Sequence, residues 1–230
     1  SLLMITAIGL GIGTAMTTVT VNYLMSANPI PHKSEQLFYV RIDSWDVNDP
    51  FDDGKNPPNQ MTYTDSTNLM KAKKAFRQNV QSQAYAVIEP DGDDILPFMV
   101  SARANSADFF AMFDVPFIYG GAWSQEADEN KEMVIVLNRE INERVFGGEN
   151  SVGKSIRLDG NIFKVVGVID HWQPKPRFYD ISTGAFNESE EIFVPFSLIA
   201  EEKIGRSGNT NCWKPSGDGF KAFLASECIW

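Results

Sequence analysis

The chain of 230 residues lacks several features that would point directly to a chemistry. Its two cysteines exclude a disulfide-dense scaffold and a zinc site built from four thiolates. Its two histidines, His32 and His171, leave little for a histidine metal site or a catalytic triad. Lys and Arg number 20 against 30 Asp and Glu, so the net charge is −10. Because phosphate binding needs clustered cations, we expect no nucleic acid partner.

Charged residues are also absent from the start of the chain. From Ser1 to His32 there is no Asp, Glu, Lys or Arg, and the first charge is Lys33. The apolar run Ser1–Met25 is long enough to cross a bilayer core, which takes about 20 helical residues. Pro29 then disfavours helix at Asn28. We therefore expect a transmembrane helix over residues 1–28 and a second domain over residues 29–230.

Two alternatives to a membrane helix remain open. A signal-like segment would need a basic region before the apolar run, and no basic residue precedes Leu2. A buried helix of a soluble domain is the other alternative. Few Lys and Arg residues follow the apolar run directly, so the positive-inside rule favours export of the C-terminal side.

The remainder of the chain shows short elements of both kinds, bounded by turn residues. The strands that the patterns predict are Leu37–Ile42, Val80–Glu89, Ile95–Ala104, Val134–Leu137, Ser155–Leu158, Phe163–Val168 and Glu191–Pro195. The helices that they predict are Thr62–Phe76, Ser106–Phe113, Asn138–Phe146 and one that starts in Phe196–Ala200. The fold class that follows is α+β.

The stretch Gly148–Ser155 fits the P-loop pattern Gly-x-x-x-x-Gly-Lys-Ser letter for letter. In a P-loop, a buried strand precedes the turn and a helix follows, so that the helix N-terminus faces the phosphate. Here the expected order is inverted, because a helix over Asn138–Phe146 precedes the turn and a strand pair follows it. We interpret the stretch as a helix-to-strand turn, with nucleotide binding as the alternative.

The same region resembles a known family. The segments Val145–Lys154 and Ile156–Val168 resemble the signature of the periplasmic core domain of MacB-type ABC permeases, relatives of the FtsX and lipoprotein-release permeases. Further segments that fit the family in the same order are Asn105–Phe110, Gly120–Trp123 and Met133–Asn138. The leading apolar segment stands where the family has its first transmembrane helix. Ser151 departs from the Pro usual in the family, and Asn187–Trp230 does not follow its pattern.

The resemblance implies two mixed α/β subdomains, one porter-like and one inserted and β-rich over roughly residues 96–190. It implies a domain without chemistry of its own, while a separate ABC ATPase subunit or domain hydrolyses ATP in the cytoplasm. The first helix would pass the resulting motion to the periplasmic part, which would move substrate or engage a periplasmic adaptor protein. A homo- or hetero-dimer is implied for the full permease.

Cys212 and Cys228 are the candidates for a disulfide, because they are 16 residues apart in a stretch rich in Gly, Ser and Asn. In an oxidising compartment they would close a loop that stabilises the fold by about 3 kcal/mol. Two unrelated thiols are the alternative.

Other groups of residues give only weak indications of a metal site, a catalytic site or a contact surface. The acidic clusters Asp46–Asp53 and Asp91–Asp94 lack the order of a calcium loop, so we interpret them as solvated turns. Asp170-His171-Trp172 has no Ser or Cys partner in a motif, and we expect a structural role. Phe109, Phe110, Phe113 and Phe117 are expected in the core, with a contact patch as the alternative. We expect no catalytic residue, no cofactor and no metal site.

The hypothesis that combines these observations is a non-catalytic extracytoplasmic domain of an ABC-type permease. It would couple ATP-driven motion to substrate export or adaptor engagement, at the bacterial inner membrane, with residues after about 28 in the periplasm. A P-loop nucleotide-binding protein is one alternative. A membrane-anchored periplasmic binding or sensor domain without an ATPase is the other.

Overall fold

The computed structural model describes residues 2–26, 28–92, 95–208, 210–214, 224 and 228–229. The chain forms two compact units. The first consists of Ser1–Phe38 and Gln173–Ser189, and the second of Tyr39–Trp172 and Glu190–Trp230.

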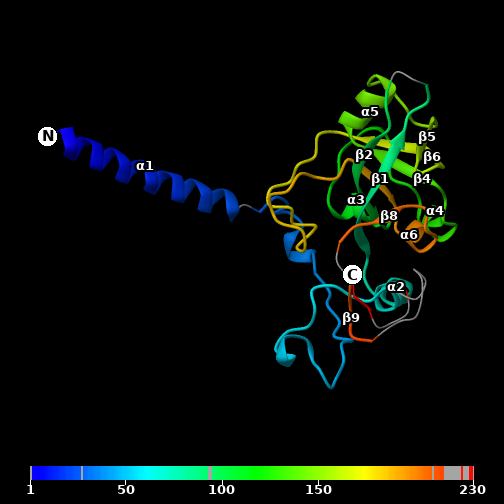
Figure 1. Cartoon of the computed structure of the whole chain (residues 1–230), viewed down its shortest axis with the longest axis horizontal. Helices are drawn as coiled ribbons and strands as arrows, with labels where there is room; N and C mark the ends of the chain where they lie inside the picture. The colour runs from blue at the N-terminus through cyan, green and yellow to red at the C-terminus, as the bar shows by residue number, and fades with distance from the viewer. Residues whose placement is uncertain are drawn as a thin grey trace. The chain divides into compact units, whose positions relative to one another are not determined.

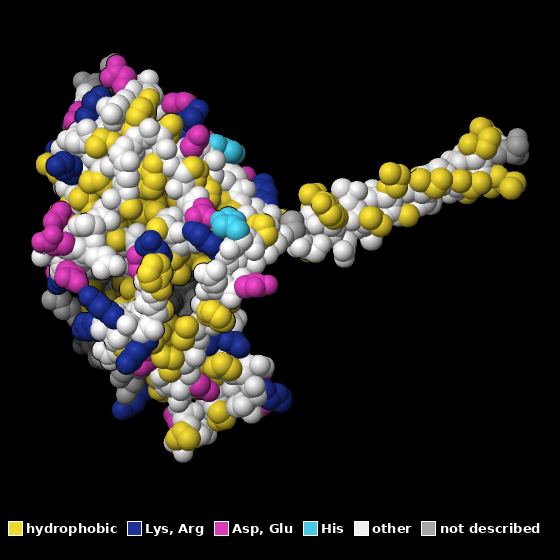
Figure 2. All heavy atoms as spheres, turned by 180° about the vertical axis from the view of Figure 1, so that it is seen from behind, with side chains coloured by type: hydrophobic (Ala, Val, Ile, Leu, Met, Phe, Trp, Pro, Cys, Tyr) yellow, Lys and Arg dark blue, Asp and Glu magenta, His cyan; other side chains and the backbone are white. Residues whose placement is uncertain are grey.

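The first unit contains the long apolar helix α1 (Leu2–Met25) and a short 3-10 turn, η1 (Ser34–Gln36). At 1.5 Å per residue, the 24 residues of α1 span about 36 Å, more than the roughly 30 Å hydrocarbon core of a bilayer. Figure 2 shows hydrophobic side chains and no charged side chain along the visible face of this helix. The Thr hydroxyls of α1 donate hydrogen bonds to carbonyls of the preceding turn, for example Thr17 Oγ1 to Gly13 O at 2.8 Å. The helix is therefore long and apolar enough to cross a membrane.

The centre of the second unit is a mixed sheet that closes on itself like a barrel (Figure 1). Six strands form the ring in the order β1–β2–β7–β4–β6–β5, and β5 pairs with β1 again. β3 is added to β6, and β8 is added to β1. The strands are β1 (Gln81–Glu89), β2 (Phe98–Asn105), β3 (Phe117–Gly120), β4 (Val134–Leu137), β5 (Ser155–Leu158), β6 (Asn161–Ile169), β7 (Ile192–Pro195) and β8 (Gly205–Arg206).

The ring encloses a hydrophobic core. In β5 the side chains alternate between solvent and core, and Ile156 and Leu158 are the buried ones. All four residues of β4 and of β7 are buried, as expected for central strands covered on both faces. Residues such as Ile88 and Phe163 are fully buried. Each large apolar side chain buried in this way contributes about 1.5–3 kcal/mol, so the core holds the sheet closed.

Short helices cover the ring, and side chains cap several of them. The helices are α2 (Tyr63–Ala72), α3 (Asp108–Met112), α4 (Gln125–Glu129), α5 (Arg139–Phe146) and α6 (Ser197–Ala200), with the 3-10 turn η2 (Phe51–Gly54) before them. The Thr62 hydroxyl accepts from Asp65 N–H and caps α2, and Asn138 accepts from Ile141 N–H and caps α5. Beyond the sheet, β9 (Asn211–Cys212) and β10 (Cys228–Ile229) form a separate two-stranded ladder.

Glycines allow β3 to lie close to β6. A Cβ at Gly120 would lie 2.1 Å from the carbonyl oxygen of Val166, and Gly120 has φ +63°, where side chains are strained. A Cβ at Gly167 would lie 2.5 Å from the carbonyl oxygen of Gly121. Only residues without a Cβ fit these two positions without a shift of the backbone.

Most of the predicted elements are present, but one strand is not. The apolar helix at the start and the mixed α/β domain are confirmed. The strand predicted over Leu37–Ile42 is wrong: these residues form no strand, and Phe38 and Tyr39 are exposed. β-branched and aromatic residues favour a strand only where a partner strand is available, and no ladder pairs with this segment in the described part of the chain.

Two predicted elements have different ends, and others were not predicted. The helix predicted over Thr62–Phe76 ends at Ala72, because Lys73 adopts a left-handed conformation with φ 47°. The strand predicted from Ile95 begins at Phe98. β3 and α4 were not predicted.

The division into a porter-like subdomain and an inserted subdomain over residues 96–190 stays a prediction. The described sheet combines β1, which precedes that range, and β7, which follows it, with strands from within the range. The structure thus has a single barrel-like sheet at its centre, in an α/β arrangement.

Candidate functional site

The glycine-rich stretch that fits the P-loop pattern joins α5 to β5, as predicted. Gly147 ends α5 in the left-handed conformation, with φ 69°, and Ser155 begins β5. A helix therefore precedes the turn and a strand follows it, which is the reverse of the order in a P-loop. No helix N-terminus faces the turn from its C-terminal side.

Several hydrogen-bond donors of this stretch have partners within the protein. The Ser151 hydroxyl is buried and donates to Asn142 Oδ1 at 2.5 Å, and the Lys154 ammonium pairs with Glu149 at 3.5 Å. Several backbone N–H groups of the turn also have acceptors, namely Gly147 (Glu143 O), Gly148 (Asn142 O), Gly153 (Val165 O) and Lys154 (Ser151 O). These contacts favour the interpretation of the turn as a structural connection between α5 and β5.

Asp170 and His171 lie just after β6, and each pairs with a residue of α5. Asp170 Oδ1 lies 2.8 Å from Arg139 Nη2, and His171 Nδ1 lies 3.6 Å from Glu140 Oε1. All four side chains are exposed, so such pairs contribute at most about 1 kcal/mol each. The position is a surface contact between α5 and the end of β6, in agreement with the predicted structural role.

Cys212 and Cys228 lie on the paired strands β9 and β10 and are joined by a disulfide in the structure. β10 also bridges Thr62, the N-cap of α2, through Ile229. Trp213, next to Cys212, packs on Trp45 with ring centroids 4.8 Å apart. The cysteine pair therefore holds the last described residues against the start of α2 and the loop before it. Its oxidation in the cell stays a prediction.

The acidic side chains of the first cluster accept hydrogen bonds from nearby residues of their own loop. Asp46 accepts from the backbone N–H of Asn48 at 2.8 Å, and Asp52 accepts from the Asn56 amide at 2.7 Å. Of the second cluster, residues 93 and 94 lie outside the described residues. Within the described part of the chain, no group of three or more His, Cys, Asp and Glu side chains is placed to hold a metal ion.

The phenylalanines of α3 pack in the core rather than forming a contact patch. Phe109 is fully buried, and its ring lies 5.5 Å from that of Phe193 on β7. Phe110 contacts Trp123 at 5.0 Å, edge to face. Such aromatic pairs contribute about 0.5–1.5 kcal/mol beyond the area they bury. Phe117 is half-buried at the start of β3.

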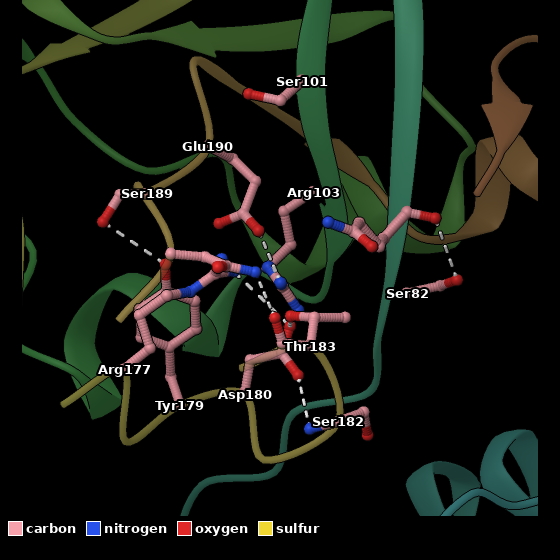
Figure 3. A network of polar contacts seen from close by, with 12 residues as sticks. Ser82, Ser101, Arg103, Arg177, Tyr179, Asp180, Ser182, Thr183, Ser189 and Glu190 are labelled. Atoms are coloured by element: carbon pink, nitrogen blue, oxygen red, sulfur yellow. Dashed lines mark hydrogen bonds and ion pairs between the residues drawn. The ribbon is translucent and has the colours of Figure 1, made fainter. Parts of the chain in front are cut away.

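Buried polar groups were not foreseen from the sequence. Arg103 on β2 and Glu190 before β7 are about 2% and 1% exposed, with Arg103 Nη2 2.5 Å from Glu190 Oε1 (Figure 3). In the first unit, Arg177 donates to Glu188 O at 3.0 Å, and Asp180 accepts from Ser182 N–H at 2.9 Å. The alternation along β2 turns Ala102 and Ala104 towards the hydrophobic core and Arg103 to the opposite face, so no local signal indicates its burial or its partner 87 residues away.

Asp128 of α4 is a partly buried carboxyl group that the sequence did not indicate. Its Oδ2 accepts from Ala107 N–H at 2.7 Å and its Oδ1 accepts from Trp123 Nε1–H at 2.8 Å. Burial raises the pKa of Asp128 to about 6, the neighbouring Asp108 and Glu129 act in the same direction, and the two hydrogen bonds oppose the shift. The carboxylate therefore joins three segments of the second unit: the start of α3, α4 and the residue Trp123 before it.

Comparisons with known proteins agree on one family. Residues 1–213 match the MacB-like periplasmic core domain. A macrolide export ATP-binding/permease protein MacB of Wolinella succinogenes is 24% identical over 106 residues, which are 46% of this chain and 15% of that protein. The chain thus matches only a small part of the length of that relative.

Solved structures give weaker likenesses. The periplasmic region of MacB from Actinobacillus actinomycetemcomitans superposes with a TM-score of 0.47 at 14% identity, over 71% of this chain and 73% of that one. The extracellular domain of the noncanonic ABC-type transporter YknZ from Gram-positive bacteria gives 0.46 at 13% identity, over the same shares of the two chains.

Proposed function

This chain belongs to the MacB-like periplasmic core domain family, and from that premise we propose that it couples ATP-driven motion of an ABC permease to substrate export or to engagement of an adaptor. The observation that carries the proposal is the family match over residues 1–213, which includes both α1 and most of the second unit. The domain itself is non-catalytic in this proposal. Its partners are an ABC ATPase subunit or domain, a periplasmic adaptor protein and a second permease copy or homologue.

The proposed location is the bacterial inner membrane, with α1 across the bilayer and residues after about 28 in the periplasm. Support comes from the length of α1 and from the absence of charge before Lys33. The adjacent cysteines Cys212 and Cys228 fit an oxidising compartment, in which a disulfide persists.

Two other functions are weighed against this one. A nucleotide-binding protein has little support, because the turn at Gly148–Ser155 uses its donors within the fold. A membrane-anchored binding or sensor domain without an ATPase has the same α1 and the same second unit, so only an experiment on coupling separates it from the proposal.

The topology is tested with single cysteines in a variant that carries Cys212→Ser and Cys228→Ser. Val47→Cys in the second unit and Leu2→Cys at the start of α1 form a matched pair, because Val47 is 88% exposed and Leu2 78% exposed. With a membrane-impermeant maleimide in intact cells, we expect Val47→Cys to react and Leu2→Cys to react only after permeabilisation. The reverse pattern, or reaction of both in intact cells, overturns the proposed location.

The coupling is tested in the complete permease with its ATPase, reconstituted in lipid nanodiscs. Hydrogen exchange of the second unit is compared without nucleotide and with ATP and vanadate. We expect peptides beyond α1 to change their exchange rates when nucleotide is bound. Identical rates throughout residues 39–230 contradict coupling and favour the binding or sensor domain.

A further inference from the structure

A cavity in the second unit lies outside every feature described so far. Its volume is about 440 Å³, within the range of about 300–1,000 Å³ usual for small-molecule sites. Side chains of α2, of residues 73–80, of the starts of α3 and α6, and of α4 line it. Much of the wall is apolar or aromatic, with Tyr63, Met70, Phe76, Val80 and Phe196. The ring of Tyr63 stacks on that of Phe196, with centroids 5.8 Å apart.

One wall of this cavity carries a carboxylate that lacks a countercharge. Asp128 lines the cavity, and the hydrogen bonds from Ala107 and Trp123 that it accepts come from neutral donors. The neighbouring acids are different: Asp108 pairs with Arg77 at 3.1 Å, and Glu129 pairs with Lys73 at 3.8 Å. Among the described residues, no Lys, Arg or His forms an ion pair with Asp128. Asp128 is thus a carboxylate of the wall without an ion pair, whereas Asp108 and Glu129 each have one.

A second polar atom of the wall also lacks a partner. The Oγ of Ser197, at the start of α6, is buried and has no hydrogen-bond partner among the described residues. Ser197 lines the same cavity as Asp128. A buried hydroxyl without a partner costs about 1–3 kcal/mol. Because this oxygen is itself buried, it does not face the cavity, and the site rests on Asp128 and the aromatic side chains.

We propose that this cavity binds a small organic ammonium ion that carries an apolar group. The carboxylate of Asp128 would pair with the charged nitrogen, and the stacked aromatic side chains of Tyr63 and Phe196 would contact the cation and its apolar group. Aromatic faces together with a negative charge are the combination that recognises ammonium ions. Lys71 and Lys73 also line the cavity; both are exposed, and Lys73 pairs with Glu129. Binding is a property of this chain alone and does not depend on the proposed transport function.

The charge of the ligand is tested on the full chain in lipid nanodiscs by titration calorimetry. The probe is benzyltrimethylammonium, a permanent cation, and benzyl alcohol and phenylmethanesulfonate serve as neutral and anionic analogues with the same ring. We expect saturable binding of the cation and at least tenfold weaker binding of both analogues. Equal binding of the three probes, or equal heats from empty nanodiscs, overturns the proposal.

The location of the site is tested with matched variants. Asp128→Asn should weaken binding of the cation by about tenfold or more, the effect of losing a close opposite charge. Glu126→Gln on the same helix removes the same net charge at an exposed position outside the cavity and should leave binding unchanged. Ala75→Trp, which fills the cavity from its exposed side, should abolish binding while the unfolding midpoint stays within the range of the wild type.

These variants keep the proposal open to refutation even if one of them fails to fold. If Asp128→Asn unfolds, Ala75→Trp still decides whether the cation occupies this cavity. Unchanged affinity in both folded variants, or an equal loss in Glu126→Gln, shows that the cation binds elsewhere.

Discussion

Replacement of Asp128 by asparagine should make the free energy of unfolding depend less on pH. In the folded chain, burial raises the pKa of this carboxyl from 3.8 to about 6, so the folded state holds its proton more tightly than the unfolded state. Between these pKa values the folded state binds more protons, and stability falls as the pH rises. The contribution is present at low pH and is lost above about pH 6. Asparagine cannot titrate, so this part of the pH dependence disappears.

The size of this effect on the free energy of unfolding follows from the pKa of Asp128 and from the partial exposure of its side chain. A rise from 3.8 to about 6 corresponds to at most about 3 kcal/mol, at 1.36 kcal/mol per unit. Asp128 is only partly buried, and solvent screening reduces this value to about 1–2 kcal/mol. The asparagine variant should therefore gain about 1–2 kcal/mol relative to the wild type between pH 4 and pH 7.5. If the substitution also changes the free energy of unfolding by an amount that does not depend on pH, that amount cancels in this comparison.

The assay is urea unfolding of the full chain in detergent micelles, followed by tryptophan fluorescence at several pH values. The five tryptophans include Trp123, which contacts Asp128 directly. Glu126→Gln serves as the control, because it removes a charge from the same helix at an exposed position. A difference between wild type and Asp128→Asn that stays constant with pH, or that changes in the opposite direction, refutes the reasoning.

Two further changes test the ladder and the sheet. Reduction of the pair Cys212–Cys228, 16 residues apart, should lower the free energy of unfolding of the second unit by about 3 kcal/mol, since it releases a closed loop; equal urea midpoints with and without reductant contradict this. Gly120→Ala should lower the free energy of unfolding by more than about 1 kcal/mol, because the added Cβ would meet the Val166 carbonyl oxygen and the φ of residue 120 is positive. Gly92→Ala is the control, because Gly92 also has a positive φ but a Cβ added there would meet nothing within 4 Å. It measures the cost of the backbone conformation without the steric clash.

The elements with strong local signals were predictable. β4 coincides with the predicted strand, because the short apolar run Met133–Leu137 between Glu132 and Asn138 indicates a buried strand. α5 follows Asn138 as predicted, because the asparagine side chain satisfies a backbone N–H that the first turn leaves open. In such segments the local sequence preferences agree with the secondary structure that the fold contains.

The remaining features depend on contacts between distant residues. Leu37–Ile42 has strand propensity but no partner in the described sheet, and a strand without a ladder is not stable. The closure of the ring depends on β1 pairing with both β2 and β5, which no local pattern contains. The charge on Asp128 and its distance from any cation likewise emerge only once α3 and α4 lie together.

The turn at Gly148–Ser155 shows why a matching pattern of letters does not determine a site. A phosphate cradle needs several N–H groups that point to one place and have no other acceptor, and it needs a helix that starts there. In this chain the glycines serve a different purpose: Gly147 and Gly148 adopt positive φ to end α5, and Gly153 adopts it to begin the approach to β5. Their N–H groups are satisfied by carbonyls of α5 and β6. The same residue types therefore connect a helix to a barrel strand in this chain.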